Sequence, residues 1–111
     1  MKIIEFNEFL DVDMRVGVIL RAEPFVEAIK PAIKLWIEFG GSIGLKQSSA
    51  QITEYYSAEN LVGKKIIAVV NLKPRQIASF MSEVLVLGAV TSDGVTLLSF
   101  DRDVDVGARI Y

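Results

Sequence analysis

The alternation of apolar and other residues over positions 32–39 most constrains the fold of this chain. Apolar side chains occupy every second position there: Ile33, Leu35, Ile37 and Phe39. This period is that of a β-strand with one buried face. Gly40-Gly41 follows at once and predicts a hairpin turn, after which residues 44–50 form the returning strand. The fold must therefore be built on an antiparallel sheet.

A second alternating segment begins at Asp13. Four of its apolar side chains are expected to share one face of a half-buried strand: Met14, Val16, Val18 and Leu20. Gly17 lies within this strand and predicts a bulge or a sharp bend, which is how a sheet curls into a small barrel. Pro24 and Pro31 bracket the connection to the next strand.

The remaining segments complete a small all-β fold. Residues 5–11 carry apolar side chains at helical spacing, and residues 51–62 predict a helix or turns that end at Gly63. Three more strands are expected, over residues 65–72, 84–90 and 95–100. This order is that of an OB-fold, a five-stranded Greek-key barrel, here a single domain of residues 1–111 with short extra helices and terminal elements. Another small β-barrel or a sandwich is the alternative.

The apolar content predicts an oligomer. At 51% hydrophobic residues, a chain of this size is expected to hide part of its apolar surface in an interface, and a homodimer is the commonest solution. Residues 66–70 and 84–87 are apolar on both faces, so the N-terminal helix or a second copy should cover their outer side. Trp36 lies on the face opposite Ile37 and could pack under a loop, contact a second copy or stack on a ligand.

Several classes of function are excluded or disfavoured by composition. The chain has no cysteine and no histidine, which rules out disulfides, thiolate nucleophiles and histidine-based metal sites or general bases. Asp101, Asp103 and Asp105 lack the glutamate spacing of a calcium loop. We therefore expect no catalytic residue, no metal and no cofactor. No apolar run is long enough to cross a bilayer and the N-terminus is not a signal peptide, so a cytoplasmic location without membrane insertion is expected.

Charge is unevenly distributed along the chain. Residues 30–75 carry seven basic and three acidic side chains, whereas residues 1–29 and residues 76–111 each have a balance of −3. A basic centre can mark an anion-binding site. Scattered solubilising lysines would give the same count.

Three polar or mixed segments are candidate ligand-binding sites. The first is a row of hydrogen-bonding side chains made of Lys46, Gln47, Ser48, Ser49 and Gln51. Such groups can bind a peptide backbone or nucleotides, or can cap the following helix, and alternation lets at most half of them face one ligand. The second is the turn with Asn71, Lys73 and Arg75, and the third comprises Phe80, Met81 and Ser82. Arginine can hold a phosphate or carboxylate, and methionine with aromatic side chains can line an adaptable pocket, although a solvated turn and ordinary core packing are the simpler interpretations.

Four segments resemble the CsaA family of the tRNA-binding-domain group, which includes appended domains of methionyl- and phenylalanyl-tRNA synthetases. They are DMRVGVI (13–19), PAIKLWIEFG (31–40), GLKQSSAQI (44–52) and LVGKKIIAVVNLKPRQIASFMSEVLVLGA (61–89). The resemblance implies a homodimeric OB-fold protein without catalysis. It also implies an export-related chaperone that binds unfolded or precursor polypeptides, with tRNA binding as the alternative. Glu83 departs from the pattern of the tRNA-binding relatives and favours a polypeptide, because it would repel phosphates.

Overall fold

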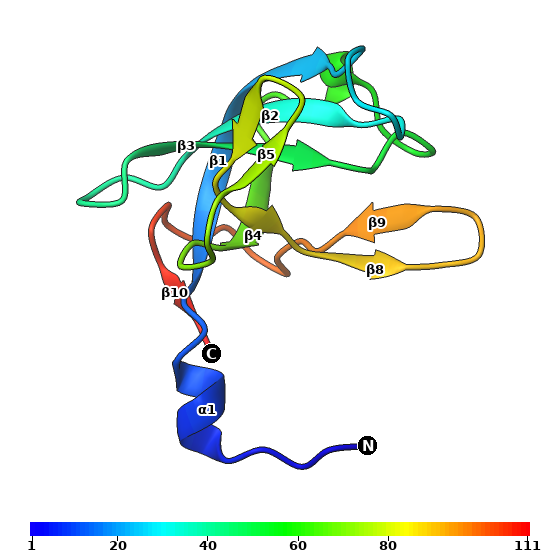
Figure 1. Ribbon diagram of the computed structural model, residues 1–111. Helices are drawn as coiled ribbons and strands as arrows, with labels where there is room; N and C mark the ends of the chain where they lie inside the picture. The colour runs from blue at the N-terminus through cyan, green and yellow to red at the C-terminus, as the bar shows by residue number, and fades with distance from the viewer.

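The computed structural model describes residues 1–111 and is mostly β-structure (Figure 1). The elements in chain order are α1 (Phe6–Leu10), β1 (Met14–Pro24), β2 (Ile33–Glu38), β3 (Leu45–Ala50), the 3-10 helix η1 (Ala58–Asn60), β4 (Lys65–Val69), β5 (Arg75–Ile77), β6 (Phe80–Ser82), β7 (Leu85–Val86), β8 (Gly88–Val90), β9 (Val95–Leu97) and β10 (Arg109–Ile110).

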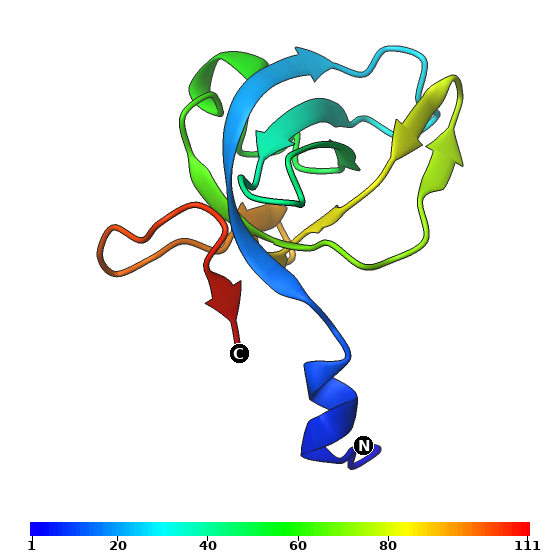
Figure 2. The same ribbon diagram turned by 90° about the vertical axis from the view of Figure 1, so that its left-hand side faces the viewer.

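Strand β1 organises the barrel because it pairs with three other strands. Its first half lies between β4 and β10, and its second half pairs with β2, so that the strand curves around the molecule (Figure 2). The antiparallel order is β3-β2-β1-β4-β7. The two ends of this sheet meet where the Glu83 N–H donates to the Gln47 carbonyl at 2.8 Å. The result is a nearly closed five-stranded barrel with the strand order of an OB-fold, as the sequence predicts.

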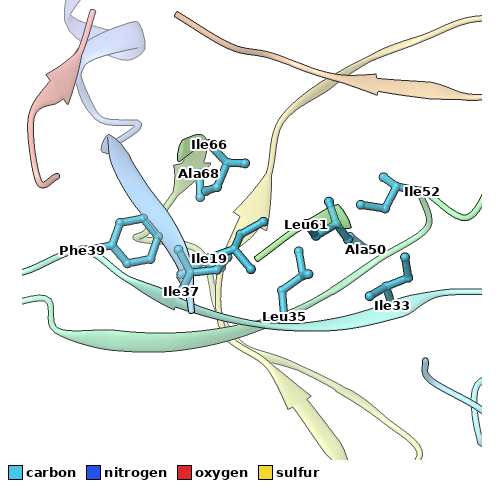
Figure 3. Close-up of a cluster of buried hydrophobic side chains, with 11 residues drawn as sticks. Ile19, Ile33, Leu35, Ile37, Phe39, Ala50, Ile52, Leu61, Ile66 and Ala68 are labelled. Carbon is cyan, nitrogen blue, oxygen red and sulfur yellow. The ribbon is translucent and has the colours of Figure 1, made fainter. Parts of the chain in front are cut away.

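The barrel interior is filled by one cluster of buried apolar side chains (Figure 3). The strand alternation predicted for β2 is confirmed, since Ile33, Leu35 and Ile37 are at most 3% exposed. Gly17 also points inward: a Cβ built on it would lie 2.5 Å from Ile37 Cγ2 and 2.7 Å from Phe39 Cε1. Glycine is therefore required at position 17 by close packing inside the barrel.

The predicted face of the first strand is partly wrong. Ile19 belongs to the core and is fully buried, whereas Leu20 is 53% exposed. Gly17 and Ile19 both face inward, so the core-facing set is the one opposite to the predicted face. The pairing of β1 with β2 then shifts register between Ile19 and Arg21, and this bulge places Ala22 rather than Arg21 against the core. Val16 is buried as well, and its N–H donates to the Ala108 carbonyl at 2.9 Å.

Other expected elements differ in length and number. The segment predicted as one strand over 84–90 divides into β7 and β8, because β8 leaves the barrel to pair with β9. The segment expected over 51–62 forms turns and the short η1, and Gly63 follows with a φ of +91°. The hairpin of β5 and β6 was not expected. Its turn at Ala78-Ser79 lacks the Asn-Gly or Asp-Gly signal, and Ala78 adopts a φ of +52°.

The apolar outer face of β4 is already covered within the single chain. A second copy is therefore not needed to cover this strand, contrary to one of the two expected possibilities. Ile67 and Val69 are only 8% and 5% exposed. Apolar exposure is found elsewhere, in α1 and the N-terminal residues, in β7 and in the β8–β9 hairpin. Figure 1 shows α1 and this hairpin projecting from the barrel. No helix of the structure has both the length and the apolar character needed to cross a bilayer.

Candidate functional site

A second, smaller apolar cluster lies on the outside of the barrel and holds two loops in place. Phe80 of β6 packs edge-on against Phe25 and Trp36, with ring centroids 5.4 Å and 5.8 Å away. The Lys34 ammonium lies over the rings of Phe25 and Phe80, and the Arg21 guanidinium lies 4.5 Å from the centre of the Trp36 ring. Of the three interpretations of Trp36, the structure shows packing under a neighbouring element, the β5–β6 hairpin.

This aromatic cluster positions both walls of a cleft. One wall is the connection between β1 and β2 (residues 25–32), and the other is the β5–β6 hairpin, which lies close to that connection in Figure 2. The first cleft has a volume of about 590 Å³. Its lining combines apolar side chains such as Ile29 and Ile77 with the polar Ser49 and Gln51 at the end of β3. In OB-folds this region, beside strands 2 and 3 and the loops that flank them, is where oligonucleotides and oligosaccharides bind.

A second cleft of about 180 Å³ lies near the base of the β5–β6 hairpin. Leu72, Lys73, Ser82 and Leu85 are among its lining residues. The two clefts share four residues, namely Ser49, Gln51, Arg75 and Ile77. They therefore adjoin one another, and we refer to both together as the groove.

Five of the residues singled out in the sequence come together in the groove. Ser49, Gln51 and Arg75 line both of its clefts, and Lys73 and Ser82 line the second. Arg75 opposes Ser82 in the hairpin, and the Ser82 hydroxyl accepts a 3.0 Å hydrogen bond from the Ser49 N–H. The polar row of β3 and the two downstream segments thus meet across 33 residues of sequence.

Two residues of the polar row close the barrel. The Ser48 side chain is 1% exposed, and its hydroxyl donates a 2.7 Å hydrogen bond to the Val84 carbonyl. Gln47 donates through its side-chain amide to the Met81 carbonyl and through its N–H to Glu83 Oε1, at 2.9 Å and 3.1 Å. The expectation that one of the two alternating sets of this row caps a following helix is wrong, because the chain forms only turns and η1 after β3.

Four more candidates lie outside the groove lining. Asn71 joins the link between α1 and β1 to the end of β4: it accepts from the Asp13 N–H at 2.9 Å and donates to the Asp11 carbonyl at 2.7 Å. Phe80 is buried in the aromatic cluster. Met81 is 39% exposed on the opposite face of β6, and Lys46 is half-buried opposite Ile37.

Several groove residues carried no motif that sequence reasoning could use. Ala28, Ile29 and Lys30 belong to the connection bracketed by Pro24 and Pro31, and only that bracketing marked it as a loop. Ile77 and Ala78 belong to the unexpected hairpin. A charged or polar residue can be singled out by type, whereas an exposed isoleucine becomes informative only when the structure shows what it lines.

Three cations of the groove have no carboxylate partner. The two carboxylates of the groove are engaged: Glu27 lies 3.5 Å from Lys34 Nζ, and Glu83 accepts from the Gln47 N–H. Arg75, Lys73 and Lys30 also line the groove, and none of the three has a carboxylate within 4 Å. Hydroxyl, amide, guanidinium and ammonium groups beside apolar side chains can bind both a backbone and an anion.

Comparison with known proteins defines the family. Residues 14–109 match the putative tRNA binding domain family. The chain is 34% identical to the methionine–tRNA ligase of Methanocaldococcus jannaschii over 99% of this chain, but it spans only 17% of that enzyme. The structure superposes with a TM-score of 0.92 on the CsaA chaperone protein from Picrophilus torridus, at 56% identity over 98% of this chain and all of that one. The CsaA chaperone from Bacillus anthracis also gives a TM-score of 0.92, at 47% identity over 99% of this chain and all of that one. The chain therefore belongs to the tRNA-binding-domain family, and within it the chain is a homologue of the CsaA chaperones.

Proposed function

We propose that this protein is a homodimeric, export-related chaperone that binds unfolded or precursor polypeptides without ATP, metal or cofactor. The observation that carries the proposal is the groove, which offers apolar side chains and hydrogen-bonding groups along the same surface. Residues 1–111 act as one binding domain in the cytoplasm. The groove binds and releases its client, and no chemical step is required.

The composition of the groove fits an extended polypeptide. Ser49 and Gln51 offer hydroxyl and amide groups that can pair with a peptide backbone of any sequence. Ile29 and Ile77 can take apolar side chains of the client. Backbone pairing combined with apolar contacts gives loose side-chain preference, which a protein that serves many clients requires.

The proposed dimer would cover the apolar surface that a single chain leaves exposed. Such side chains gather at the N-terminus and in the elements that project from the barrel: Ile3, Phe6 and Val90 are between 66% and 84% exposed. Patches of this kind mark interaction surfaces. Sedimentation equilibrium should give about twice the 12.3 kDa chain mass at micromolar concentration. A species that stays at the mass of one chain would contradict the dimer.

The chaperone activity is tested by light scattering of an unfolded client. A chemically unfolded polypeptide diluted into buffer aggregates, and an equimolar amount of this protein should reduce the scattering without added ATP. An unrelated acidic protein of similar size is the control. Equal scattering with this protein and with the control would contradict the proposed function.

tRNA is the second candidate ligand. It is favoured by the family match and by the three unpaired cations of the groove. Such binding would be electrostatic and would weaken steeply with salt. A gel shift with total tRNA at low salt tests it, and the absence of any shift would exclude it.

A further inference from the structure

Arg75 occupies the junction of the two clefts of the groove. It lies at the start of β5, on the same face of the hairpin as Ile77, because side chains two residues apart share a face. Ile29 and Ala78 line the first cleft beyond it, and Leu72 and Leu85 line the second. A segment that fills both clefts therefore passes the guanidinium of Arg75 with apolar side chains before and after it.

This guanidinium has no anionic partner in the chain. Glu83 is the carboxylate that lines the second cleft together with Arg75, and it accepts from the Gln47 N–H instead. Glu27, in the first cleft, pairs with Lys34. An exposed guanidinium can bind a carboxylate through two parallel hydrogen bonds, and its planar fork sets the direction of that contact.

We propose that the groove selects extended polypeptide segments in which an Asp or Glu side chain is flanked by apolar residues, and that Arg75 determines this selectivity. The inference rests on the proposed function and adds a preference to it. The client carboxylate binds the Arg75 guanidinium, and its apolar neighbours enter the clefts on either side. Lys30 and Lys73, at the two clefts, add positive potential without fixing a direction.

Polypeptide fits these observations better than RNA does. Both ligands are anionic, but no aromatic side chain lines either cleft. Unpaired bases bind proteins largely by stacking on aromatic rings. Trp36 of the neighbouring cluster does not supply such a platform, since Phe80 packs edge-on against it and Arg21 lies over its ring.

The test uses fluorescence anisotropy with two labelled ten-residue peptides. They are identical and apolar around one central residue, which is Glu in one peptide and Gln in the other. The wild-type protein should bind the Glu peptide about tenfold more tightly, as a charge-assisted hydrogen bond predicts. In Arg75→Gln this preference should vanish, while affinity for the Gln peptide changes less than about threefold. Arg75→Lys keeps the charge but not the fork and should retain only part of the preference.

Lys64→Gln is the matched control. It removes one exposed, unpaired positive charge outside both clefts and should leave the preference unchanged.

Equal binding of both peptides by the wild type, or an equal loss in Lys64→Gln and Arg75→Gln, would overturn the inference. Binding of neither peptide by a protein that still suppresses client aggregation would overturn it too. Displacement of the Glu peptide by tRNA, with both ligands lost in Arg75→Gln, would assign the site to RNA phosphate instead. Failure to hold any client would refute the proposed function itself.

Discussion

The hydroxyl of Ser48 donates a 2.7 Å hydrogen bond to the carbonyl of Val84 inside the barrel. The two residues are 36 positions apart, and both are buried. This bond lies at the seam where β3 meets the segment that leads into β7. It therefore holds the barrel closed directly behind the groove, whose polar Ser49 lies next in the chain on the outward face.

Replacement of Ser48 by alanine should destabilise the protein by about 1–3 kcal/mol, because the Val84 carbonyl would remain buried without its donor. Ser49→Ala removes the neighbouring hydroxyl, which makes no hydrogen bond within the chain, and should cost less than about 0.5 kcal/mol. Urea unfolding of both variants measures the difference. Equal stability of the two variants would show that the seam does not depend on this bond.

Gly17→Ala should destabilise the protein by about 1–3 kcal/mol through overpacking. The new methyl group would lie 2.5 Å from Ile37 Cγ2 and 2.7 Å from Phe39 Cε1. Ile37→Leu removes the branch at Cβ, so Gly17→Ala should cost less in that background. A double-mutant cycle by chemical denaturation measures this coupling. A cost that is unchanged by Ile37→Leu would contradict the contact.

Stability should depend on the ionisation of Asp13. A hydrogen bond from the Arg15 side chain is the main cause that lowers the pKa of Asp13 below its ordinary value of 3.8, and the charges of Arg15 and Arg109 add to it, while partial burial opposes it. The folded pKa is below the unfolded one, so this stabilisation is fully present above the unfolded pKa and is lost as the pH falls through the folded pKa.

Asp13→Asn should therefore be less stable than the wild type near pH 7, by up to about 1 kcal/mol. The difference should disappear as the pH falls below 3.8. Thermal unfolding of both proteins across pH 2 to pH 7 tests this expectation, with Asp101→Asn as a control that breaks no ion pair. A constant difference over the whole range would refute the electrostatic role of Asp13.

Phe80→Leu should loosen both walls of the groove. Leucine loses the two edge-on ring contacts and the contact with Lys34, which should cost about 1–3 kcal/mol. Trp36 is the only tryptophan and packs on Phe80, so its emission should shift. Phe100→Leu, a half-buried change outside the cluster, should leave the emission unchanged. The same emission in all three proteins would contradict this assignment of the cluster.

The strands of the barrel could be predicted from the sequence where only one of their two faces packs against the core. Ile33, Leu35 and Ile37 alternate with half-buried residues, and their strand and its Gly40-Gly41 hairpin are present as expected. β1 was harder to interpret because Val16 and Gly17, on opposite faces, are both buried, and because a bulge between Ile19 and Arg21 then shifts its inward set. A bulge depends on the strands that pair on either side, which local sequence does not specify.

The groove was only partly predictable. Ser49, Gln51 and Arg75 could be singled out in the sequence because their side chains are polar or charged. The same criterion also selected Ser48, because a serine that closes a barrel and a serine that faces a ligand have the same sequence signature. The β5–β6 hairpin was missed because its turn places Ala78, a residue with no turn preference, at a positive φ. Tertiary contacts of Phe80 hold that turn in place of local turn chemistry.

The most direct test of the account is the binding of a labelled, permanently unfolded polypeptide to a protein whose groove has been altered. Ile29 lines the first cleft with its side chain fully exposed, so Ile29→Asp should place a charge in the groove without disturbing the fold. Val62→Asp makes the same change at an exposed position outside both clefts. We expect tight binding by the wild type and Val62→Asp, and binding weakened about tenfold in Ile29→Asp, as one lost apolar contact and one buried charge imply. Equal affinity of all three proteins, or no binding by the wild type, would contradict the assignment of this groove to polypeptide clients.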